Sequence, residues 1–218
     1  MFFKSPTTGN IIGRYKVILR TTNGGKSWTE HHSPIKVMPL LSTFFLDSLN
    51  GYVTGWYGII MHTSDGGANW EQQKSGVTTF LRSVQFANDS LGLVVGEQGC
   101  LLRTTNGGKD WNYVESETAK NLTSVCFLDK NTAVAVGDTG TIVRSTTGGK
   151  SWECRQSVSK HNLRGVSFVG KNGTIEGESG TIRRSTECGS SGKDEAQPSG
   201  PPLHADDRMD AHDSQCVG

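Results

Sequence analysis

The chain has 218 residues, of which 33% are hydrophobic and 28 are glycine. Glycine at nearly double its average share of about 7% indicates a protein rich in turns. No apolar run reaches the ~18 residues of a membrane-spanning helix, and the opening segment MFFKSPTTGN lacks the apolar core of a secretory signal. The sequence therefore predicts no membrane span and no signal peptide, and it leaves the cellular compartment undetermined.

The formal net charge of +1 conceals two regions of opposite sign. Residues 1–188 contain 20 basic and 15 acidic side chains, whereas residues 189–218 contain 2 basic and 6 acidic ones. The first region has no block of Lys or Arg, so we expect no nucleic-acid surface. No Cys and His residues are spaced as metal ligands, so we expect no metal and no cofactor. The second region is rich in Gly, Ser and Pro, which predicts a disordered acidic tail.

One motif recurs along the chain with a nearly constant period. Its copies end at Trp28, Trp70, Trp111 and Trp152, at intervals of 42, 41 and 41 residues, and read RTTNGGKSW, HTSDGGANW, RTTNGGKDW and RSTTGGKSW. A degenerate fifth copy, RRSTECGSSGK, reaches position 192 with Gly where Trp is expected. A glycine pair G-x-x-G and an apolar pattern L-x-x-[VT]-x-F keep the same period. A fixed period of this length predicts a repeat fold.

Each repeat contains four short segments with the composition of β-strands. In the repeat from Leu81 to Val114 these are LRSVQF, LGLVV, CLLRT and WNYV, separated by Gly, Asn and Asp turn residues. In chain order, the residues after Gly13 supply strands three and four of a first unit. Three complete units follow from Leu40, and a partial unit begins at Leu163.

These units predict an all-β protein. We expect a β-propeller of four-stranded antiparallel blades with a repeat of about 41 residues. It occupies residues 1–188 as an incomplete or small propeller of four to five blades, and residues 189–218 follow as the tail.

The motif between the third and fourth strands has a structural explanation. Its Asp or Asn accepts backbone N–H bonds, its glycines supply positive φ, and its Trp buries a large ring between neighbouring blades. A single Asp per turn does not supply the oxygen ligands of a calcium site. We assign this structural role to Asn23, Gly25, Trp28, Asp65, Gly67, Trp70, Asn106, Gly108, Trp111, Gly149 and Trp152.

These residues resemble a known pattern, the Asp-box S/T-x-D-x-G-x-x-W, which Thr63, Asp65, Gly67 and Trp70 match in full. The longer pattern G-x-x-G-x-[IL]-x-R-[TS]-T-x-G-G-x-x-W is similar to that of the BNR-type propellers of the photosystem II assembly and stability factor family. The resemblance implies about seven blades, which would need roughly 290 residues. The chain is then truncated at both ends, or its terminal strands pair and close a ring of four.

The same resemblance implies a non-catalytic protein-binding scaffold that holds a newly made photosystem II reaction-centre subunit. The family setting implies the thylakoid lumen, or the periplasm or exterior in other bacteria. Open propeller edges are a second route to association. Two alternatives stay open, because Asp-boxes also occur in unrelated activities. They are a carbohydrate-binding or sialidase-like glycoside hydrolase propeller and a truncated, non-functional fragment.

The sequence shows no catalytic constellation. Glycoside hydrolysis needs two carboxylates that face each other across a cleft, and several acids off the consensus, such as Glu97 and Asp138, sit in Gly-flanked turns. The R-I-P element of sialidases and a Ser-His-Asp arrangement are both absent. We therefore predict that the chain is not an enzyme and has no catalytic residues.

Two sets of residues are candidates for binding a partner. Trp56 and Tyr57 lie between the paired glycines of one repeat, where the other repeats carry polar residues, and they suit stacking on a sugar, anchoring a protein or packing against another blade. One cation recurs on each third strand, where it forms either an arc that binds acidic groups or a set of contacts between blades. These cations are Arg20, His62, Arg103, Arg144 and Arg184.

Overall fold

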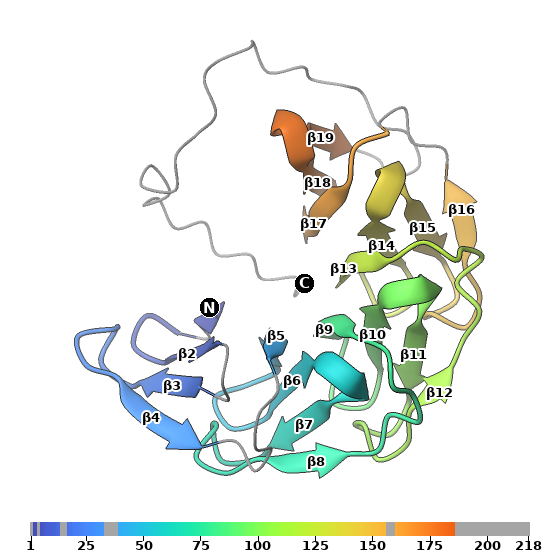
Figure 1. Cartoon of the computed structure of the whole chain (residues 1–218). Helices are drawn as coiled ribbons and strands as arrows, with labels where there is room; N and C mark the ends of the chain where they lie inside the picture. The colour runs from blue at the N-terminus through green and yellow to red at the C-terminus, as the bar shows by residue number, and fades with distance from the viewer. Residues whose placement is uncertain (1, 4, 14–16, 33–38, 156–159, 186–218) are drawn as a thin grey trace.

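The computed structural model describes residues 2–3, 5–13, 17–32, 39–155 and 160–185. These residues form nineteen β-strands and four single-turn 3-10 helices, and no α-helix occurs among them. The strands make five antiparallel sheets that follow one another around a common centre (Figure 1). The prediction of an all-β propeller is confirmed, and the described sheets leave its ring open between the first sheet and the fifth.

Each sheet is one blade, and we number the blades 1 to 5 in chain order. Blade 1 contains β1 (Phe2–Phe3), β2 (Gly9–Ile12), β3 (Val17–Thr21) and β4 (Thr29–His32). Blade 2 contains β5 (Leu40–Phe45), β6 (Gly51–Gly55), β7 (Ile60–Thr63) and β8 (Glu71–Gln73). Blade 3 contains β9 (Leu81–Phe86), β10 (Gly92–Gly96), β11 (Leu101–Thr104) and β12 (Asn112–Tyr113). Blade 4 contains β13 (Leu122–Phe127), β14 (Ala133–Gly137), β15 (Ile142–Ser145) and β16 (Glu153–Arg155). The described part of blade 5 contains β17 (Leu163–Val169), β18 (Asn172–Gly177) and β19 (Ile182–Ser185).

The first blade has more strands than the sequence indicated. Residues Phe2–Phe3 pair with Gly9–Asn10, and β2 pairs with β3, so four strands replace the expected two. The sequence missed β1 and β2 because this repeat keeps neither the complete apolar pattern nor the second glycine of the pair. The predicted tail at 189–218 lies outside the described residues.

A short 3-10 helix joins the second and third strands of blades 2 to 5. These helices are η1 (Trp56–Gly58), η2 (Glu97–Gly99), η3 (Asp138–Gly140) and η4 (Glu178–Gly180). Figure 1 shows them as coiled ribbons on the same face of the propeller. We call this face the turn rim. The Asp-box turns follow the third strands and therefore lie toward the opposite face.

The core is divided among the seams between blades. At the seam between blades 3 and 4, Leu93 and Leu101 of one blade pack with Val125 and Trp152 of the next. The innermost strands are also joined, because the N–H of Val84, Val125 and Val166 each donates to a serine Oγ of the preceding blade at 3.3 Å. Each blade is therefore stabilised mainly by its neighbours, as in other repeat proteins.

Candidate partner-binding surface

The Asp-box turns are closed by their own side chains. The Asp65 carboxylate accepts bonds from the N–H of Asn69 at 2.9 Å and from its side-chain amide at 2.8 Å, and it also accepts from the Thr63 hydroxyl at 2.8 Å. These bonds, with those from Asn69 first, lower the pKa of Asp65 to about 2. Asn23 and Asn106 accept the equivalent N–H bond at 3.0 Å. Among the described residues, no three potential ligands gather to hold a metal ion.

The Asp-box tryptophans lie at the seams. Trp70, Trp111 and Trp152 are buried, and Trp70 and Trp152 donate their indole N–H to Gly67 and Gly149 at 3.1 and 3.2 Å. Trp111 donates instead to the Gln73 side chain of blade 2 at 3.0 Å. Trp28 belongs to the first blade and is half-buried. The rings of Trp70, Trp111 and Trp152 therefore occupy equivalent positions between blades.

The third-strand cations occupy one register position in every blade, opposite the second-strand residues Asn10, Tyr52, Leu93, Val134 and Thr174. Arg103 donates its Nε–H to the carbonyl of Gly148 in the Asp-box turn of the next blade at 2.7 Å. Burial lowers its pKa. The Arg20 guanidinium likewise lies against Gly66 of blade 2, where an added Cβ would be 2.9 Å from it. Both arginines therefore contact the neighbouring blade.

His62 departs from this arrangement. Its ring lies 4.7 Å from the ring of Tyr52, and burial lowers its pKa. The Tyr52 hydroxyl donates to the Gly107 carbonyl of the next blade at 3.1 Å, which is the contact that Arg103 makes one seam later. Burial, followed by Asp89 and Asp47, raises the pKa of Tyr52 to about 12. Tyr52 thus supplies the contact that His62 does not.

On the turn rim, an asparagine joins the η turns of neighbouring blades. Asn121 accepts a bond from the N–H of Gln98 at 2.9 Å and donates to the Asp138 carboxylate at 2.8 Å. Asn162 repeats this one seam later, with the N–H of Thr139 at 2.9 Å and Glu178 at 2.9 Å. We call this arrangement the asparagine bridge.

At the seam between blades 2 and 3, an aromatic group takes the place of the asparagine bridge. Phe80 stands where Asn121 and Asn162 stand in the next blades. Its ring stacks on Trp56 with centroids 4.5 Å apart and 8° between planes, and Tyr57 meets it edge-on at 5.7 Å. Tyr57 is 55% exposed and has φ 54°. The sequence indicated Trp56 and Tyr57 but missed Phe80, although its place before Leu81 could have shown the substitution.

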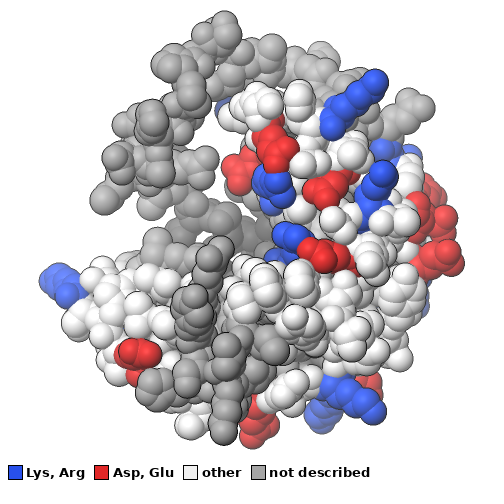
Figure 2. Space-filling model, in the orientation of Figure 1, with Lys and Arg blue, Asp and Glu red and all other residues white. Residues whose placement is uncertain are grey.

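The two predicted sets of binding residues do not come together. Trp56 and Tyr57 belong to η1 on the turn rim, whereas Arg20 and Arg103 contact Asp-box turns, which lie toward the opposite face. On the turn rim, Arg82 pairs with Glu97 and Arg164 pairs with Glu178. Figure 2 shows charged side chains of both signs over blades 3 to 5 and an uncharged surface over η1.

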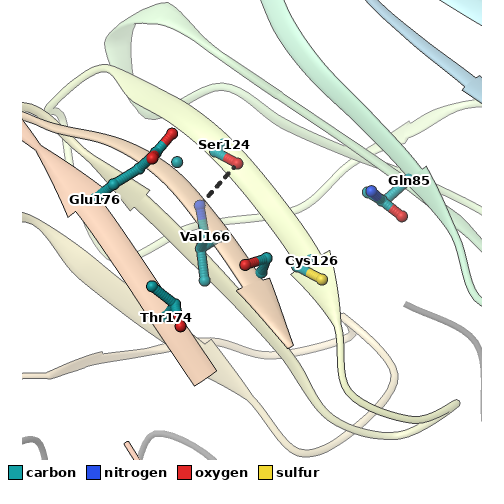
Figure 3. Close-up of a pocket in the computed structure, with 8 residues that line it drawn as sticks. Gln85, Ser124, Cys126, Val166, Thr174 and Glu176 are labelled. Atoms are coloured by element: carbon teal, nitrogen blue, oxygen red, sulfur yellow. Dashed lines mark hydrogen bonds between the residues drawn. The ribbon is translucent and has the colours of Figure 1, made fainter. Parts of the chain in front are cut away.

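The innermost strands of blades 3 to 5, together with β18, border a hollow of about 350 Å³ (Figure 3). Among the described residues that line this hollow, Glu176 is the one with a carboxylate. The other lining residues are Gln85, Ser124, Cys126, Gly165, Val166, Ser167 and Thr174. None of the described helical segments is long and apolar enough to span a membrane.

Comparison with known families accounts for this architecture. The model of the family described as photosynthesis system II assembly factor YCF48, a BNR family, matches residues 1–76, 32–120 and 109–195. The chain belongs to this family. No curated protein matches it in sequence.

Solved structures share the propeller fold of this YCF48-family chain. YCF48 bound to D1 peptide matches with 17% identity and a TM-score of 0.61, covering 88% of this chain and 78% of that one. YCF48 from Cyanidioschyzon merolae matches with 18% identity and a TM-score of 0.64, covering 81% and 65%. An ancestral GH74 enzyme matches with 15% identity and a TM-score of 0.72, covering 87% of this chain and 30% of the enzyme. The chain therefore spans part of the length of each structure.

Proposed function

We propose that this chain is a non-catalytic scaffold that binds a polypeptide segment of a photosystem II reaction-centre subunit. The observation that carries the proposal is membership of the YCF48 family over residues 1–195. A solved YCF48 structure contains a D1 peptide, which names a polypeptide as the class of ligand. In the same setting, the thylakoid lumen of a photosynthetic host is the proposed compartment.

The arrangement of the acids supports a non-catalytic role. A glycoside hydrolase places two carboxylates across a sugar-sized cleft. On the turn rim, Glu97 and Glu178 pair with arginines, and Asp138 accepts a bond from Asn121. The similarity to the GH74 enzyme extends to the fold alone, because a sequence identity of 15% carries no information about activity.

Direct binding tests this proposal. A fluorescently labelled D1 peptide is titrated with the 218-residue chain, and anisotropy is measured against a scrambled peptide of the same composition. We expect saturable binding of the D1 peptide alone. Equal binding of both peptides, or release of reducing sugar from xyloglucan by the chain, would contradict the proposal.

A further inference from the structure

The seam between blades 2 and 3 differs from the next two seams of the turn rim, and this difference indicates a specific part of the binding surface. Two seams are joined by asparagine bridges, and aromatic rings replace that polar network at the seam between blades 2 and 3. Leu41, which is 38% exposed, stands at the β5 position where Arg82 and Arg164 form ion pairs in blades 3 and 5. We call Leu41, Trp56, Tyr57 and Phe80 the aromatic corner.

Packing within the chain does not account for the whole aromatic corner. The stack of Trp56 on Phe80 closes the seam, but Tyr57 leaves 55% of its surface in water. Its φ of 54° places a bulky residue in the left-handed region, which is unfavourable for it. Gln98, Thr139 and Ser179 hold this backbone conformation in the other blades with polar side chains. An exposed aromatic ring held in such a conformation suits contact with a ligand.

The charges beside the aromatic corner indicate what kind of segment would lie there. The acids Glu97, Asp138 and Glu178 of the turn rim are each bonded to an arginine or an asparagine. Lys120, which directly precedes Asn121, and Lys160, which lies two residues before Asn162, are exposed and form no ion pair with any residue that the structure describes. These two lysines therefore place positive charge next to the asparagine bridges.

We propose that the aromatic corner anchors an apolar side chain of an extended polypeptide segment whose acidic residues continue over the turn rim toward Lys120 and Lys160. The inference rests on the proposed function, because it assumes a polypeptide ligand. Aromatic rings bury large area at low entropic cost, which is why they dominate the energetics of such anchors. The lysines steer the acidic part of the segment and make binding depend on salt.

The repeat itself supplies a variant that should fold. Phe80→Asn places an asparagine between the Tyr57 N–H and Glu97, the same pair of partners that Asn121 has one seam later. Combining it with Trp56→Gln and Tyr57→Gln removes the three rings of the aromatic corner without changing the net charge. Tyr113→Gln is the matched control, because Tyr113 is a 62% exposed aromatic residue on β12, outside the corner.

The triple variant is compared with the unchanged chain in binding the labelled D1 peptide. We expect the thermal midpoint to stay nearly constant and the affinity to fall about ten- to hundredfold, as for loss of an interface anchor. Tyr113→Gln should leave the affinity unchanged. Lys120→Gln with Lys160→Gln should weaken binding at low salt and flatten its salt dependence. Equal affinity of the triple variant would overturn the inference while leaving the proposed function intact.

If the unchanged chain does not bind the D1 peptide, the proposed function fails and a second probe decides the inference. A random peptide library is selected on the unchanged chain and on the triple variant. Enrichment of apolar residues flanked by acids on the unchanged chain alone supports the anchor. Identical enrichment on both proteins overturns it. So does loss of glycan binding or of dimerisation in the triple variant, since the occupant is then a sugar or a second copy.

Discussion

At the scale of single residues, the third-strand cations determine how neighbouring blades are joined. Arg103 has its Nε–H engaged by the Gly148 carbonyl, and Tyr52 makes the same type of contact where His62 replaces arginine. Retention of this contact when the residue type changes indicates that the contact itself is needed. The alternative role, an arc that binds acidic groups, stays a prediction for this position.

We expect Arg103→Gln to lower the free energy of unfolding by about 1–2 kcal/mol, because a charge-assisted bond to Gly148 is lost at a half-exposed site. Urea unfolding monitored by Trp fluorescence measures the change. Lys109→Gln removes the same charge from an exposed side chain and should leave the midpoint in place. If Arg103→Gln leaves stability unchanged and abolishes peptide binding, the arginine belongs to a binding arc.

The Asp-box turn of blade 2 can be tested through the pH dependence of stability, because the pKa of Asp65 is lowered in the folded chain. Its folded pKa of about 2 lies below the ordinary value of 3.8, so the unfolded chain binds the proton more readily. The stabilisation is present above the ordinary pKa and is lost as pH falls through about 2. Asp65→Asn should remove this part of the acid sensitivity in denaturation curves taken between pH 5 and pH 2. Little loss is expected at pH 7, because Asn23 and Asn106 make the equivalent bond.

At the scale of elements, the η turns are held by close contact with the following blade. An added Cβ on Gly99, at φ +69°, would lie 1.8 Å from the Thr118 carbonyl oxygen. Gly180 has the same place in blade 5 and a φ of +71°, yet an added Cβ there meets nothing within 4 Å. Both positions therefore favour glycine because of their positive φ, and Gly99 also requires it because a Cβ would clash with the backbone of Thr118.

This pair separates the two requirements experimentally. Gly180→Ala should cost about 1–2 kcal/mol, the price of a left-handed alanine. Gly99→Ala adds a clash with the backbone and should lower the free energy of unfolding by more than about 4 kcal/mol, which is exceptional for a single substitution. Equal shifts of the urea midpoint would show that blades 3 and 4 separate easily at this turn.

At the scale of the whole molecule, the two ends of the blade array differ in chemistry. Leu93 and Val95 of blade 3 face blade 4 and are fully buried. The same strand positions in blade 5 hold Thr174 and Glu176, which are exposed. A polar face of this kind does not match the apolar faces that join blades 3 and 4. Association through open propeller edges stays a prediction, and at the edge of blade 1 Trp28 is half-buried.

We expect Thr174→Val combined with Glu176→Val to make the chain associate, because the outer face of β18 then matches a seam. Light scattering after size-exclusion chromatography, over a range of protein concentration, measures the mass. Glu115→Val removes one exposed acid elsewhere and controls for the change in charge. The explanation fails if the control associates as strongly as the double variant.

The sequence by itself determined the blades, the Asp-box turns and the expected family. These features depend on contacts within a few residues, such as the bond from Asn69 to Asp65, so a local motif is enough to specify them. Blade 1 shows the limit, because its first two strands lack the complete apolar pattern and form by pairing, β2 with β3 and β1 with β2.

Only the tertiary structure decided what happens between blades. Arg103 and Gly148 are 45 residues apart, and Tyr52 and Gly107 are 55 apart, so their contacts depend on how one sheet is rotated against the next. A period in the sequence aligns equivalent positions but does not state which of them meet. For the same reason Trp56 and Tyr57 could be predicted as an exception, while their partner Phe80, from the following blade, became visible once the sheets were packed.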